Sequence, residues 1–194
     1  AFFYRFVNTV GRCSHEKEYD VIVCNSESDV NKEKRHIDML LRKGVDGMIY
    51  APVDHRTRHD DLLTWEIPFV QIERQSEAYS VDYVGIDDVG EAKRIVTHLR
   101  ETGHQRIGFL MHGGGQYLGR RYAGYRDALV RAGAYESGLV ERLSSDVSPP
   151  SEALRAWLTA NPDMDAVVCV SLKLCLHLLG VVRQIGASDI TLFS

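Results

Sequence analysis

The chain has 194 residues, of which 44% are hydrophobic and 26% are charged, and its formal net charge at pH 7 is −4. This is ordinary globular composition, and the length suffices for one large domain or for two lobes that each have a core. The negative charge argues against broad binding of a nucleic-acid backbone by these residues, because such binding requires a basic face.

The first half of the chain alternates helical and extended patterns. Residues 3–18 and 29–42 have helical patterns, and Gly44 follows the second one, as is typical of a helix end. Short runs rich in β-branched and apolar residues predict strands at residues 19–24, 45–51, 67–72 and 84–86.

The second half continues this alternation. Asp87 and Asp88 begin a helix that Gly103 closes, and carboxylates at such a position cap free N–H groups and face the positive end of the helix dipole. Further strands are predicted at residues 106–111, 139–143, 166–170 and 190–193. Further helices are predicted at residues 117–132, 151–159 and 172–185.

Repeated strand–helix units with short apolar strands predict an α/β fold. The strands should form parallel sheets that are covered by helices on both faces and joined by right-handed crossovers. Residues 45–52 and 164–171 each place an aspartate before a strand and after a helix, which indicates that the arrangement occurs twice. We therefore expect two lobes, residues 1–102 and residues 103–194.

The four cysteines form no CxxC pair, and Cys24 and Cys169 lie inside apolar runs, where cysteine behaves as a small hydrophobic residue. This pattern does not indicate a disulfide framework and favours a reducing, cytoplasmic compartment. The longest apolar run, near residues 174–182, is too short to span a bilayer, and no signal peptide is visible.

Several phrases occur in a characteristic order along nearly the whole chain. They are KGVDGMI at residues 43–49, VGIDD at 84–88, HL at 98–99 with TGHQRI at 102–107, and RYAGYRDAL at 121–129. With the aromatic pair Phe2–Phe3, this ordered set resembles the effector-binding domain of the lactose/galactose repressor (LacI/GalR) family of bacterial transcription regulators.

The resemblance implies a two-lobed, periplasmic-binding-protein-like (type I) fold in which a small polar effector, expected to be a sugar or sugar derivative, binds between the lobes. It also implies a homodimer, and contact with operator DNA only through a helix-turn-helix that this chain lacks. Relative to the family, the first strand of the N-terminal lobe and the last strands after residues 189–194 are missing.

Arg121 is the strongest candidate for a ligand-binding residue. A guanidinium presents fixed N–H donors that fork onto two ligand oxygens, and the resemblance places Arg121 at the effector-binding arginine of the family. The alternative is a surface arginine on an amphipathic helix.

Other candidates are weighed against structural roles. Phe2, Phe3 and Phe6 match positions that line the pocket in the family, although core packing explains Phe6 equally well. Asp87 and Asp88 are acceptors for ligand hydroxyls or simply cap a helix.

The expected pocket wall departs from the family at three positions. Val147 stands where an aromatic residue is common, and Ser171 and Leu172 replace an Asn–Asp pair. Ser171 offers one hydroxyl, whereas Leu172 cannot form a hydrogen bond with its side chain. The ligand is therefore expected to be less polar than the usual sugar of the family, or to be oriented differently.

No pattern in the sequence indicates an enzyme or a cofactor. The glycine run at residues 113–115 lacks the Lys–Ser/Thr of a P-loop, and no nucleophile–base order is defensible. His55 and His59 have helical metal-ligand spacing, but their charged neighbours favour a solvated helix start. The remaining alternatives are a periplasmic sugar-binding protein of a transporter and an enzyme on the same scaffold.

Overall fold

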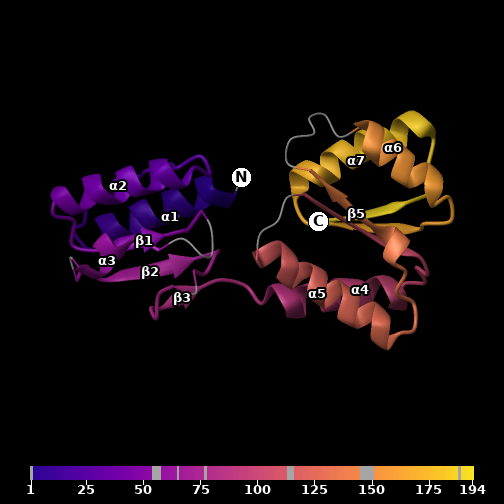
Figure 1. Cartoon of the computed structure of the whole chain (residues 1–194), viewed down its shortest axis with the longest axis horizontal. Coiled ribbons are helices and arrows are strands. Elements are labelled where there is room, and N and C mark those ends of the chain that lie inside the picture. The colour runs from indigo at the N-terminus through magenta and orange to yellow at the C-terminus, as the bar shows by residue number, and fades with distance from the viewer. Residues whose placement is uncertain are drawn as a thin grey trace. The chain divides into compact units, whose positions relative to one another are not determined.

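The computed structural model describes residues 2–53, 58–64, 66–76, 78–112, 116–144, 151–187 and 189–194. The chain forms two compact units, Ala1–Val84 and Gly85–Ser194, which we call unit 1 and unit 2. Each unit contains a parallel sheet flanked by helices (Figure 1), so the predicted α/β class is confirmed.

Unit 1 contains a three-stranded sheet in the order β1-β2-β3, with all neighbours parallel. Its core is a small cluster around Ile37, Leu41 and Tyr50. The strands are β1 (Met48–Tyr50), β2 (Phe69–Ile72) and β3 (Tyr83–Val84), and the helices are α1 (Phe2–His15), α2 (Val30–Arg42) and α3 (Asp60–Thr64).

Helix α2 follows from its sequence pattern. Asp29 caps its first turn, because one carboxylate oxygen accepts hydrogen bonds from the amides of Asn31 at 2.7 Å and Lys32 at 3.1 Å. Ile37, Leu40 and Leu41 lie on the buried face of the helix. Gly44 then adopts a φ of +69°, a conformation that favours glycine after a helix end.

The segment at residues 19–24, which the sequence predicts as a strand, does not belong to a sheet in this structure. Val21, Ile22 and Val23 are 41%, 51% and 60% exposed, although their apolar pattern is that of a buried strand. The strand prediction is wrong for this structure because no neighbouring strand of the described chain pairs with the segment.

Unit 2 contains a four-stranded parallel sheet in the order β5-β4-β6-β7. Helices α4 and α5 cover one face, and α6 and α7 cover the other (Figure 1). The strands are β4 (Ile107–His112), β5 (Val140–Leu143), β6 (Ala166–Cys169) and β7 (Thr191–Phe193), and the helices are α4 (Asp88–Glu101), α5 (Gln116–Arg131), α6 (Ser151–Ala160) and α7 (Leu172–Ile185). The sequence predicted each of these elements to within a few residues.

The units divide after Val84, whereas the sequence pattern placed the boundary after residue 102. The difference concerns α4, which packs along α5 and therefore belongs with unit 2. Gly124 permits this contact, because a Cβ at that position would lie 2.3 Å from the carbonyl oxygen of Val89 and 2.9 Å from the Cβ of Ala92.

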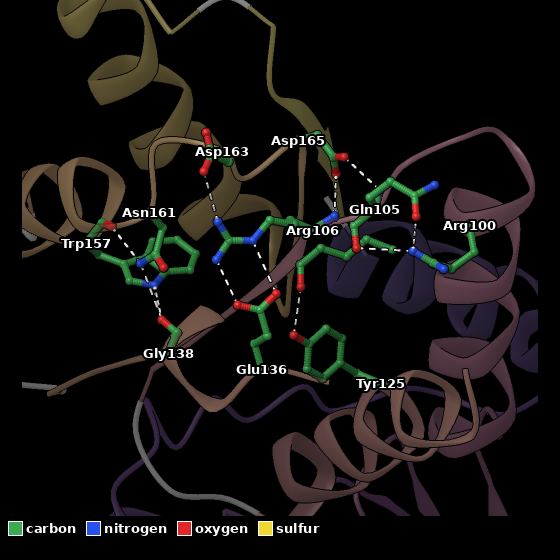
Figure 2. A network of polar contacts seen from close by, with 11 residues as sticks. Arg100, Gln105, Arg106, Tyr125, Glu136, Gly138, Trp157, Asn161, Asp163 and Asp165 are labelled. Carbon is green, nitrogen blue, oxygen red and sulfur yellow. Dashed lines mark hydrogen bonds and ion pairs between the residues drawn. The ribbon is translucent and has the colours of Figure 1, made fainter. Parts of the chain in front are cut away.

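A polar network closes the amino-terminal end of the unit 2 sheet (Figure 2). Arg106 binds Glu136 through two hydrogen bonds, of 2.8 Å and 3.2 Å, and also reaches Asp163 at 3.4 Å. Asp165 accepts from the backbone amides of Gln105 at 2.6 Å and Arg106 at 3.2 Å. Asp165, which directly precedes β6, therefore joins the start of β6 to the start of β4.

The histidine of the TGHQRI phrase has a similar structural role. Nε2 of His104 lies 3.0 Å from Oγ1 of Thr191, and Nδ1 lies 3.0 Å from the carbonyl oxygen of Leu99. His104 therefore links the end of α4 to β7, on the far side of the sheet order from β5.

We expect Gly124→Ala to lower the free energy of unfolding by about 2 kcal/mol, because the added methyl group has to push α4 and α5 apart. The matched control is Gly119→Ala on the same helix, where nothing lies within 4 Å of the added Cβ. The control should be neutral or stabilising by roughly 0.5–1 kcal/mol. Urea denaturation measures both, and equal effects would contradict the packing argument.

Candidate functional site

Arg121 on α5 is held by two elements of unit 2. Its Nε donates to Oδ1 of Asp88 at 2.8 Å, and its Nη1 donates to the carbonyl oxygen of Val170 at 2.8 Å. Val170 directly follows β6, so the guanidinium lies at the carboxyl end of that strand. In open parallel sheets, this end is where ligands bind.

Asp88 is the buried partner of this ion pair. Its side chain is 5% exposed, whereas the side chain of Arg121 is 32% exposed. A buried carboxylate needs a charged or hydrogen-bonding partner, and Arg121 supplies both. The side chain of Arg121 is therefore the more accessible member of the pair.

Asp87 and Asp88 have different roles in the structure, although the sequence pattern allowed the same two roles, helix cap or ligand acceptor, for both. Asp87 is the N-cap of α4 and accepts from the backbone amide of Gly90 at 3.1 Å. Asp88 begins the helix and binds Arg121. The capping role predicted from the sequence is confirmed for Asp87, whereas the ion pair of Asp88 was not predicted.

Ser171 and Leu172 lie beside Val170 at the start of α7. Ser171 is extended, with φ −152° and ψ 149°, and its hydroxyl oxygen accepts from the amide of Leu174 at 3.4 Å. Ser171 is therefore the N-cap of α7. Leu172 is 61% exposed. Val147, the other predicted wall position, lies outside the described residues.

The structure thus brings Arg121, Asp88, the carbonyl of Val170, Ser171 and Leu172 to one end of unit 2. We call this group the Arg121 site. It combines an anchored hydrogen-bond donor with an exposed apolar side chain. Such a pairing suits a ligand that has both hydroxyl groups and an apolar face.

The aromatic candidates belong to unit 1. Phe3 is 47% exposed and Phe6 is half-buried, and both line a cavity of about 890 Å³ within that unit. Phe2 begins α1, but its side chain lies outside the described residues. The cavity is formed by α1, α2, β1 and residues 18–24, all of unit 1, whereas Arg121 and its partners belong to unit 2.

Unit 1 contains a buried polar pair that the sequence pattern did not predict. Nε2 of His59 lies 2.9 Å from Oε2 of Glu33, and these side chains are 3% and 4% exposed. Oε1 of Glu33 accepts from the amide of Val53 at 2.7 Å, and the Tyr79 hydroxyl contacts the amide of His59. Burial, together with the negative charge of Glu33, raises the pKa of Tyr50.

The sequence signal for this pair was the helical spacing of Glu33 with Ile37 and Leu40, which places a carboxylate on the apolar face of α2. The prediction that His59 decorates a solvated helix start is wrong, because His59 is buried against Glu33. His55 lies outside the described residues. Within the described ranges, no three His, Cys, Asp or Glu side chains are placed to hold a metal ion.

Residues 1–182 match the family described as periplasmic binding proteins and sugar binding domain of LacI family. The maltose regulon regulatory protein MalI of Escherichia coli (strain K12) is 31% identical over 183 residues, which cover 88% of this chain and 52% of MalI. The chain spans about half or less of the length of the curated relatives it matches.

Solved structures show the same architecture. Transcription regulator GntR from Chromobacterium violaceum has a TM-score of 0.81 and 23% identity, over 96% of this chain and 70% of that one. The complex of transcriptional regulator CelR with cellobiose has a TM-score of 0.65 and 29% identity, over 83% of this chain and 52% of that one. No helix in the described part of the chain has the length and apolar character to cross a membrane.

We expect Glu33→Ala to lower the free energy of unfolding by about 3 kcal/mol, because it leaves His59 and the Val53 amide without their buried partner. The control is Glu27→Ala. Glu27 pairs with Lys32 at the surface, where its side chain is 63% exposed, so its loss should cost under about 1 kcal/mol. Urea denaturation distinguishes the two, and a small effect of Glu33→Ala would show that the buried pair adds no stability.

Proposed function

Because this chain belongs to the family of periplasmic binding proteins and LacI-type sugar-binding domains, we propose that it senses a small polar effector for a bacterial transcription regulator. The effector is a sugar or a sugar derivative, and it binds between the two lobes. The observation that carries this proposal is the guanidinium of Arg121, anchored at the carboxyl end of β6.

The anchoring prepares Arg121 for binding. Asp88 and the carbonyl of Val170 fix the guanidinium in one orientation, so little side-chain freedom is lost when a ligand arrives. The plane of the guanidinium then directs N–H groups toward neighbouring hydroxyl oxygens of the ligand. Preorganised donors of this kind give affinity and orientation together.

The charge of the site favours a neutral ligand. Asp88 balances Arg121, so the pair adds no net charge to the Arg121 site. A phosphorylated sugar would need additional cations, whereas the hydroxyl groups of a neutral sugar need only oriented donors and acceptors. The relative named as the CelR–cellobiose complex contains a neutral disaccharide, which supports this choice.

Leu172 sets the second requirement on the ligand. It is 61% exposed and follows Ser171, whose hydroxyl oxygen already accepts a helix amide. An apolar side chain at this position suits the C–H face of a sugar ring or a nonpolar substituent on it. The effector is therefore amphipathic, with hydroxyls toward Arg121 and an apolar face toward Leu172.

Sensing follows from a difference in affinity between two lobe arrangements. An effector that binds one arrangement more tightly shifts the population toward it, and a homodimer passes that shift to DNA-binding segments outside this chain. The matched relatives are transcription regulators, which supports regulation over transport and over catalysis.

We expect Arg121→Ala to weaken effector binding by at least ~2 kcal/mol, about 30-fold, because a charged hydrogen-bonding partner is lost. A thermal-shift screen of the full-length protein against neutral sugars, sugar phosphates and purines identifies the effector, and calorimetry gives the affinity. The control is Arg120→Ala, the exposed neighbour on α5. Unchanged affinity in Arg121→Ala removes this residue from the site.

Leu172→Asn is expected to weaken binding of the same effector by about 1–3 kcal/mol, because an apolar contact is replaced by a polar group. The matched control is Leu176→Asn, one turn along α7, which is 58% exposed and lies farther from Val170. Calorimetry compares the two variants. Equal affinities in both would mean that Leu172 does not touch the ligand.

A further inference from the structure

Two cysteines of unit 2 lie side by side. Cys169 ends β6 and is 4% exposed, whereas Cys175 lies one turn into α7 and is half-buried. A hydrogen bond joins the two thiol groups, so their sulfur atoms are in direct contact. Both side chains also pack in the large apolar core of unit 2. The fold therefore brings together two thiols that come from different elements.

The segment between the two cysteines is part of the Arg121 site. The carbonyl oxygen of Val170 accepts a hydrogen bond of 2.8 Å from Arg121, and Ser171 is the N-cap of α7. Leu172, which is 61% exposed, begins the helix. A covalent bond between the two sulfurs therefore closes a short loop that contains Val170, Ser171 and Leu172.

The two thiols differ in accessibility and in reactivity. Burial, together with its contact with Cys175, raises the pKa of the Cys169 thiol, so Cys169 is protonated at neutral pH. An oxidant in solution reaches Cys175 first, because Cys175 is half-buried and its neighbours on α7 include the exposed Leu172 and Leu176. An accessible thiol beside a second, protected thiol is the arrangement of a redox-sensing pair.

We propose that Cys169 and Cys175 are a modification site, at which a hydroperoxide converts the two thiols into a reversible disulfide. The hydroperoxide first transfers one oxygen atom to Cys175, which gives a sulfenic acid and releases water or an alcohol. The sulfur of Cys169, which is already in contact, then attacks the sulfenic sulfur. The S–S bond forms, and the Cys169 proton leaves with the sulfenic hydroxyl as water. The two sulfurs lose two electrons, the peroxide bond gains them, and a thiol reductant restores the pair.

A reversible bridge agrees with the cysteine pattern of the sequence, which does not indicate a structural disulfide framework. In reducing compartments, disulfides are usually transient and serve redox sensing or catalysis. The reduced pair already fills its place in the core, because a thiol packs as a small hydrophobic group. Unit 2 is therefore folded in the reduced form, and oxidation adds a constraint to it.

The bridge has a structural consequence, because an S–S bond requires the sulfurs to approach to about 2.05 Å. Strand β6 is fixed, since it pairs with β4 on one side and with β7 on the other. The first turn of α7 is held less firmly, because the Ser171 hydroxyl accepts from the Leu174 amide over 3.4 Å, which is long for a hydrogen bond. The shift therefore falls on Ser171 and Leu172. The bridge itself does not depend on which ligand the Arg121 site binds.

Mass spectrometry of the full-length protein tests the bridge. The reduced protein is treated with hydrogen peroxide, denatured and alkylated at acidic pH to prevent thiol exchange, and then digested. Trypsin cuts after Lys173, so the bridge should join the peptides of Cys169 and Cys175, and dithiothreitol should separate them. The exposed Cys13 is the internal reference for the oxidant. The proposal is overturned if Cys169 and Cys175 are still alkylated at a peroxide dose that oxidises Cys13, or if they bridge only to other cysteines.

Two variants separate the roles of the two sulfurs. In Cys169→Ala, peroxide should leave Cys175 as a sulfenic acid, which dimedone traps. In Cys175→Ala, Cys169 should remain a thiol, because it is buried. Circular dichroism checks that both variants are folded, and Cys175→Ala changes only a half-buried position. Oxidation of Cys169 at the same rate in Cys175→Ala as in the wild type contradicts the proposed order of steps.

Hydrogen exchange tests whether the bridge moves the start of α7. In the oxidised wild type, the amide of Leu174 should exchange at least ~10-fold faster than in the reduced protein, because its N-cap hydrogen bond is lost. The amides of β6 should not change, and peroxide-treated Cys175→Ala should behave like the reduced wild type. Unchanged exchange at Leu174 in a protein shown to be bridged would mean that oxidation does not act on the Arg121 site.

Discussion

The guanidinium of Arg121 connects three elements of unit 2 through two hydrogen bonds. Asp88 begins α4, Arg121 lies on α5, and Val170 follows β6, and both bonds measure 2.8 Å. Because Asp88 is almost fully buried, the pair has to stay intact in any arrangement that keeps α4 in place. The Arg121–Asp88 ion pair therefore holds the Arg121 site together and also joins α4 to α5, the two helices on one face of the unit 2 sheet.

That contact depends in turn on how closely α4 and α5 approach. Gly124 lies one helical turn after Arg121, and only the absence of a Cβ lets α5 touch the backbone of Val89. Val96 and Leu99 of α4 then reach the core that Tyr125 and Leu129 of α5 also enter. Gly124 thus allows α5 to approach α4 closely, and Arg121 of the same RYAGYRDAL phrase bonds to Asp88 across that contact.

The sequence predicted most of unit 2, because its central strands β4 and β6 are buried and its helices α4 and α7 begin at side-chain N-caps, Asp87 and Ser171. It could not predict that Asp88 pairs with Arg121, since a carboxylate at a helix start fits a capping role equally well. The bond from Arg121 to Val170 could not be predicted either, because a backbone carbonyl is present at every residue and a side-chain pattern does not show which one is used. In unit 1, residues 19–24 have the composition of a strand, but strand pairing depends on residues far away in the chain.

The two units therefore differ in what stabilises them. Unit 2 has a large apolar core and a sheet whose amino-terminal end is closed by the Arg106 network. Unit 1 has a small core and a buried Glu33–His59 pair that adds polar specificity more than hydrophobic stabilisation. Among its described residues, no strand pairs with the side of β1 that faces away from β2. Units with few buried apolar contacts open at lower free energy than those with many. Unit 1 is therefore expected to open locally at a lower free energy than unit 2.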